Sequence, residues 1–191
     1  MLRSPILALL IPLAASAAVI DRVAVVVGST VITESEVLDA VRLTEFVNGE
    51  ALDLGPRARR AAAERLVDQQ LIRNEMELGR YTPPPASDAD RLLGTFRQQR
   101  FPSAAQYEQA LKTYGITEDE LKSYLLWQET VLRFTDMRFR PGLPGPSEES
   151  ANRLQDGATA APGDTVDERL DAWLKESREN TRIIFKPEAF Q

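Results

Sequence analysis

The chain has 191 residues, of which 43% are hydrophobic and 27% are charged. This content is enough for one well-packed core, and it argues against an intrinsically disordered chain and against a polytopic membrane protein. The sequence has no histidine and no cysteine, which excludes disulfides, thiol and imidazole catalysis, and the common zinc sites. The formal net charge of −6 argues against a nucleic-acid partner, because neutralising phosphates requires a basic surface.

The first 17 residues have the organisation of a secretory signal peptide. A basic residue and an apolar run precede Ala15-Ser16-Ala17, whose small side chains suit cleavage before Ala18. A membrane anchor is the competing interpretation, but Pro12 interrupts the apolar run, which falls short of the roughly 20 residues that cross a bilayer. We therefore expect an exported mature chain, residues 18–191, without stable membrane insertion.

The first structural element expected in the mature chain is a β-hairpin over residues 23–33. Two β-branched runs surround Gly28-Ser29, and glycine at the first central position is what a two-residue type II′ turn requires. A dinucleotide-binding turn is the alternative, but the further glycines that a pyrophosphate site needs are missing after Gly28.

A series of helices should follow, because capping residues and helix breakers divide the chain at short intervals. Thr33-Glu34-Ser35-Glu36 and Thr117-Glu118-Asp119-Glu120 are capping boxes, and Ser103 is a natural cap after Pro102. The helices are expected over residues 34–46, 56–80, 87–100, 103–115 and 117–139. The short turns between them predict antiparallel neighbours in a compact bundle.

Apolar spacing predicts the buried faces of the two longest helices. In the earlier one, the stripe and the residues that widen it are Ala63, Leu66, Val67, Leu71, Ile72, Met76 and Leu78. In the later one, the stripe consists of Leu121, Leu125, Leu132 and Phe139. The earlier helix should be largely buried.

The pattern changes after Arg140. Residues 141–164 are rich in proline and glycine and predict a linker with a short helix over 147–155. Thr165-Val166-Asp167-Glu168 is another capping box, and Leu170, Trp173 and Leu174 mark the amphipathic helix that it opens.

A short strand, residues 181–185, is expected after this helix and before Pro187. A lone terminal strand must pair with something, and the hairpin is the only other strand material. The expected fold class is therefore mainly α: a helical bundle with a small β-sheet formed by the N-terminal hairpin and the C-terminal strand.

No motif in the sequence supports an enzyme. Without histidine a general base would have to be a carboxylate, and none of the 29 acidic residues stands out. Asp88-Ala89-Asp90 resembles a metal-binding fragment, but its place at a helix start favours capping and dipole roles. We therefore expect no catalytic residue, no metal and no cofactor.

Aromatic residues are concentrated in one stretch: of the seven Phe, four Tyr and two Trp, eight lie between residues 96 and 139. In the simpler interpretation they fill the core, and in the functional one some of them line an apolar groove for another polypeptide. Tyr124 and Trp127, three residues apart on a helix whose apolar stripe lies elsewhere, are the first candidates for exposed contacts. The full set of candidate polypeptide-binding residues is Phe96, Phe101, Tyr107, Tyr114, Tyr124, Trp127 and Phe134.

Three parts of the chain, at both ends and in the middle, carry a resemblance. These are Ile20–Val27 with Val31–Val37, Glu64–Ile72, and Leu170–Arg178 with Ile183-Ile184. Together they resemble the N-terminal chaperone domain of SurA-type periplasmic proteins. The resemblance implies that residues 18–191 form one such domain, in which the helix and strand of residues 165–191 complete the hairpin and bundle of residues 18–140.

Members of this family usually carry parvulin-type prolyl isomerase domains between the bundle and the C-terminal helix. Here that interval is residues 141–164, whereas an independent domain takes roughly 50 residues or more. Parvulin sites in the family use histidines, which this sequence lacks. The resemblance therefore implies a chaperone domain without the isomerase domain.

The function that the resemblance implies is that of an ATP-independent periplasmic holdase without cofactors. It would bind unfolded outer-membrane or secreted polypeptides through an apolar, aromatic-lined surface. Two alternatives stay open: an adaptor or subunit in cell-envelope assembly that binds one folded partner, and a residual prolyl isomerase. Broad affinity for unrelated aromatic peptides would separate the chaperone from the adaptor, and proline-limited refolding at the uncatalysed rate would exclude the isomerase.

Overall fold

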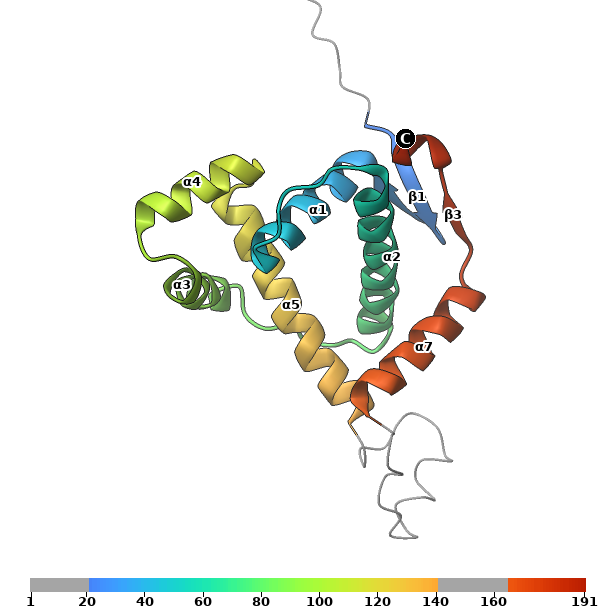
Figure 1. The fold of residues 1–191 in the computed structure, drawn as a ribbon. Helices are drawn as coiled ribbons and strands as arrows, with labels where there is room; N and C mark the ends of the chain where they lie inside the picture. The colour runs from blue at the N-terminus through green and yellow to red at the C-terminus, as the bar shows by residue number, and fades with distance from the viewer. Residues whose placement is uncertain (1–20, 141–164) are drawn as a thin grey trace, which may run out of the picture.

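The structure is a computed structural model that describes residues 21–140 and 165–191. The predicted signal peptide and the predicted linker with its short helix lie outside the described residues. The described part is mainly helical with a small sheet, as predicted (Figure 1). In chain order the elements are β1 (Val23–Val27), β2 (Thr30–Thr33), α1 (Glu34–Asn48), α2 (Pro56–Leu78), α3 (Asp88–Arg100), α4 (Ala104–Tyr114), α5 (Glu118–Phe139), α7 (Val166–Asn180), β3 (Ile183–Phe185) and the 3₁₀ helix η1 (Pro187–Phe190).

The N-terminal hairpin and the C-terminal strand meet in one antiparallel sheet with strand order β2-β1-β3 (Figure 1). Val25 in the central strand pairs with Ile32 on one side and with Phe185 on the other. Gly28 has a φ of 60°, which the predicted turn requires at its first central position. The predicted pairing of the two ends is confirmed, although β3 is shorter than the predicted strand and η1 follows where only a stop at Pro187 is predicted.

The capping boxes predicted from the sequence are present at the starts of α1, α5 and α7. Thr33, Thr117 and Thr165 each accept a hydrogen bond from the backbone N–H three residues later, and the glutamate at that position accepts one from the threonine N–H. Ser103 caps α4 as predicted by accepting from the N–H of Gln106. The start of α3 differs, because Ser87 has a helical conformation and its side chain makes no capping bond.

Apolar side chains gather in three clusters. The first joins the sheet to α1 and α2 and includes Val25 and Val67. The second lies among α1, α3, α4 and α5 and includes Phe46 and Leu121. The third lies among α2, α5 and α7. Its buried members are Ile72, Met76, Phe134 and Phe139.

The prediction of a buried position is wrong for two residues, Leu78 and Leu132. Leu78 is 83% exposed and Leu132 is 66% exposed. At 3.6 residues per turn, Leu132 lies on the same side of α5 as Leu121, but it lies beyond the second cluster, which Leu121 joins. Farther along, α5 packs into the third cluster through Phe134, on the opposite side of the helix, and through Phe139, which lies on the same side as Leu121 and is buried as predicted. One continuous stripe therefore does not describe α5, and Leu78 sits at the uncovered end of α2.

Polar contacts hold α7 against α2. The Arg178 Nη1 lies 2.7 Å from Glu64 Oε2, and its Nε lies 2.7 Å from Asp68 Oδ1. Its Nη2 donates to the backbone carbonyl of Glu64 at 3.0 Å. No side chain of α7 is fully buried, although Trp173 and Leu174 pack against the first and third clusters. Ion pairing therefore supplements half-buried apolar contacts in fixing this helix.

Candidate functional site

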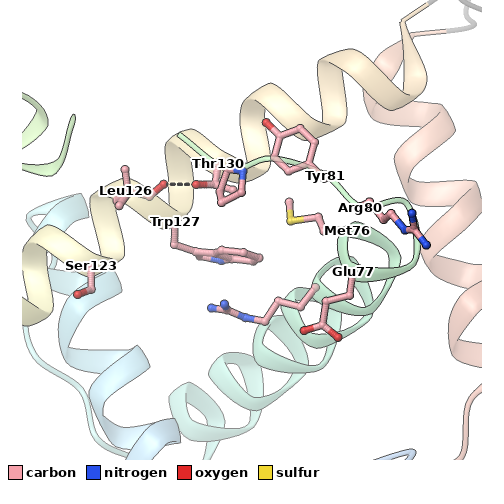
Figure 2. Close-up of a pocket in the computed structure, with 10 residues that line it drawn as sticks. Met76, Glu77, Arg80, Tyr81, Ser123, Leu126, Trp127 and Thr130 are labelled. Atoms are coloured by element: carbon pink, nitrogen blue, oxygen red, sulfur yellow. Dashed lines mark hydrogen bonds between the residues drawn. The ribbon is translucent and has the colours of Figure 1, made fainter. Parts of the chain in front are cut away.

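A groove of about 560 Å³ lies between α2 and α5 (Figure 2). Its lining comes from the C-terminal part of α2, from the connection that follows it, and from the middle of α5. The lining residues are Arg73, Met76, Glu77, Arg80, Tyr81, Pro83, Ser123, Leu126, Trp127 and Thr130.

Trp127 projects from α5 into the space between the two helices (Figure 2). The guanidinium carbon of Arg73 lies 3.7 Å from the centre of the Trp127 ring, which is a cation–π contact. The indole Nε1 of Trp127 is buried and has no hydrogen-bond partner in the described part of the chain. Leaving a buried donor unpaired costs about 1–3 kcal/mol. The groove wall therefore contains a donor that no described residue satisfies, and an acceptor from another molecule reaches it only when neighbouring side chains of the groove move.

The apolar wall of the groove is continuous with the third cluster. Met76 is buried in that cluster, and Trp127 and Tyr81 pack against it. The Tyr81 ring meets Phe134 edge-on, with ring centres 5.4 Å apart. Leu126 adds further apolar surface from α5. A flexible, polarisable methionine beside aromatic rings adapts to differently shaped apolar groups.

The end of α2 brings Tyr81 to the groove. The helix ends at Leu78, and Arg80 then has a φ of 50°, a left-handed conformation that few residues other than glycine adopt. The backbone N–H of Tyr81 donates to the carbonyl of Met76 at 2.9 Å. The chain thus turns back sharply before the Pro83-Pro84-Pro85 run, whose fixed φ angles prevent the helix from continuing.

The charged residues of the groove are Arg73, Arg80 and Glu77. Neither arginine forms an ion pair with a carboxylate of the described residues. Burial lowers the pKa of Arg73, and the charge of Glu77 opposes this change. The guanidinium remains protonated at neutral pH, because its ordinary pKa is far higher. The groove therefore presents two arginines and one glutamate, with no ion pair to any of them among the described residues and a net charge of +1.

The structure separates the seven predicted polypeptide-binding residues, all of which lie in the described ranges. Trp127 lines the groove, and Tyr124 is half-buried on α5 outside it. Tyr107 and Phe134 are each only 2% exposed and belong to the core. The other three are half-buried around Phe46 in the second cluster: Phe96, Phe101 and Tyr114.

Sequence analysis did not single out Arg73, Tyr81 or Leu126 as site residues, and it placed Met76 in the core. An arginine on an exposed helix face carries no signal of its own. The proline run after Tyr81 marks a forced break in the chain, but it does not show which helix the tyrosine will face. The groove residues come together only through the packing of α5 against α2.

A second hollow of about 390 Å³ lies beside Tyr107 and Phe101, between α3 and α4. The Tyr107 hydroxyl donates to Glu118 Oε2 at 3.3 Å, and the Arg97 guanidinium carbon lies 4.5 Å from the ring centre. Burial, together with Glu118, raises the pKa of Tyr107 to about 12. These polar groups are already paired with one another, so this hollow has less capacity for a ligand than the groove.

No family model and no curated protein matches this chain. Within the two described ranges, no three side chains of the metal-ligating types lie close enough together to hold a metal ion. No helix in those ranges is both long enough and apolar enough to cross a membrane.

Proposed function

We propose that this protein is an ATP-independent chaperone that holds unfolded polypeptides in the groove between α2 and α5. The observation that carries the proposal is the combination of adaptable apolar surface at Met76 and Leu126 with the unpartnered Nε1 of Trp127. An unfolded chain complements both features: its uncovered apolar side chains match the apolar surface, and its free backbone carbonyls are acceptors for the Trp127 donor.

The chemistry of the groove suits weak binding to many sequences. Promiscuous binding sites use flexible surfaces that repack around different ligands, and methionine is well suited to this. A protein that binds only the unfolded state holds its client by mass action and needs no nucleotide. We expect no isomerase activity, because the groove offers no histidine for such a site. This expectation agrees with a holding function.

The resemblance to SurA-type N-terminal domains supports the same proposal and extends it. Together with the expected signal peptide, it supports a periplasmic location and unfolded outer-membrane proteins as clients. The net charge of −6 discourages self-association at the high local concentrations of a holding complex.

Suppression of aggregation tests the proposal. A denatured β-barrel protein is diluted into buffer with increasing amounts of the purified chain, and light scattering is recorded. We expect scattering to fall with concentration, and Leu126→Ser to weaken the effect. Leu132→Ser is the matched control, because Leu132 is an exposed leucine on the same helix outside the groove. No suppression at any concentration, or equal effects of the two variants, would reject the groove as the holding site.

A further inference from the structure

The polar lining of the α2–α5 groove is richer in donors than in acceptors, although the carboxylate of Glu77 is part of it. Arg73 and Arg80 are pure donors, and so is the unpartnered Nε1 of Trp127. The hydroxyl of Thr130 already donates to the Leu126 carbonyl at 2.7 Å (Figure 2). A ligand that brings acceptors, and negative charge in particular, would complement this lining.

Arg73 is the groove cation that most clearly lacks an ion-pair partner among the described residues. Its guanidinium stacks on Trp127, and no carboxylate of the described residues pairs with it. Arg138, which reaches from α5 to α2 nearby, instead pairs with Glu75 at 3.3 Å. Arg73 is exposed to solvent, so an incoming carboxylate can reach its guanidinium. Partial desolvation lowers the pKa of Arg73 against the opposing charge of Glu77, and a bound anion would offset this desolvation.

We propose that the groove selects polypeptide segments in which an acidic side chain lies next to an apolar one. The side-chain carboxylate binds Arg73, and a backbone carbonyl of the same segment accepts from Trp127 Nε1. The neighbouring apolar side chain lies against Met76 and Leu126. The inference rests on the proposed function of the groove and specifies which segments of a client it holds.

This selectivity runs against the overall charge of the protein. At long range, a chain with a net charge of −6 repels acidic peptides and attracts basic ones. A preference for acidic segments can therefore arise only from a local contact. For this reason the comparison between acidic and neutral peptides is decisive.

Peptide binding tests the inference. Three labelled peptides of equal length, acetylated and amidated, repeat Phe-Glu, Phe-Gln or Phe-Lys, and fluorescence anisotropy gives their dissociation constants. We expect the Phe-Glu peptide to bind about fivefold more tightly than the Phe-Gln peptide, equivalent to about 1 kcal/mol. Arg73→Gln should abolish this preference, whereas Arg65→Gln should keep it. Arg65 is a matched control because it is exposed on the same helix outside the groove.

A fourth peptide, Phe-Gln with a free C-terminus, distinguishes a side-chain carboxylate from a terminal one. A preference that appears only with the free terminus would overturn the inference, as would equal binding of Phe-Glu and Phe-Gln. A preference that survives in Arg73→Gln would do the same. In each of these cases the proposed function stands if Leu126→Ser weakens all the peptides. Absence of binding by every peptide overturns both proposals. Circular dichroism confirms that each variant is folded.

Discussion

Removing the guanidinium that joins α7 to α2 tests how the C-terminal helix is held. Arg178→Met loses the contacts to the Glu64 carboxylate, the Asp68 carboxylate and the Glu64 carbonyl. The three side chains are 31%, 35% and 29% exposed, so solvent screens these contacts well below the strength of buried charged hydrogen bonds. At about 0.7 kcal/mol for each contact, we expect the free energy of unfolding to fall by about 2 kcal/mol.

Urea unfolding followed by circular dichroism measures this loss from the shift of the midpoint. Arg182→Met is the matched control, because Arg182 is exposed just beyond α7 and its side chain makes no hydrogen bond or ion pair with the described residues. It should change stability by less than about 0.5 kcal/mol. A similarly small change in Arg178→Met would refute the view that these ion pairs hold α7.

The same contacts make the effect depend on pH. Burial acts to raise the pKa of Glu64, but hydrogen bonds and charge from Arg178 and Arg60 outweigh it, so the pKa falls below its ordinary value of 4.5. A carboxyl with a lowered folded-state pKa stabilises the protein above its unfolded-state pKa, and this stabilisation is lost as pH falls through the folded-state value. The difference between wild type and Arg178→Met should therefore be full at neutral pH and should shrink as the pH falls below the ordinary value of 4.5. An unchanged difference would contradict this linkage.

Further predictions concern α5 and its neighbours. Leu121→Ala removes a side chain that is 0% exposed and should lower the free energy of unfolding in urea by about 2–5 kcal/mol. Leu132→Ala should lower it by less than about 0.5 kcal/mol. Equal losses would contradict the different packing of these two leucines on α5. Thr117→Ala removes the capping box at the start of this helix and should cost about 1 kcal/mol in the same assay. Alkaline titration followed by ultraviolet absorbance should show one phenol ionising at about pH 12, and Tyr107→Phe should remove that step.

The fold could be predicted where local chemistry decides it. Thr33 and Thr117 specify helix starts, because each cap and its glutamate satisfy backbone N–H groups within one turn of the chain. Gly28 specifies the hairpin, because its φ of 60° is strained for other residues. The closure by β3 followed from elimination, since an isolated strand leaves its backbone groups unpaired and the hairpin was the only available partner.

The candidate site could not be predicted because packing between distant elements decides it. The crowding of aromatics near α5 was visible in the sequence, but four of the eight pack in a group around Phe46, which lies outside that stretch. Whether Trp127 faces a core or a groove depends on which side of α5 meets α2, and α5 packs on more than one side along its length. The spacing of apolar residues within one helix contains no such information.

The ion pairs along α2 show which charged residues of this helix have an intramolecular partner. Toward its N-terminal end, Glu64 and Asp68 bind Arg178 of α7. Toward its C-terminal end, Glu75 binds Arg138 of α5. Arg73 lies between these two attachments and contacts an aromatic ring instead of a carboxylate of the described residues. Arg65 of α2 also has no carboxylate partner among the described residues, but it lies outside the groove. The combination of the unpaired Arg73 with the unpaired indole N–H beside it therefore marks the groove as the surface where a second polypeptide would gain the most by binding.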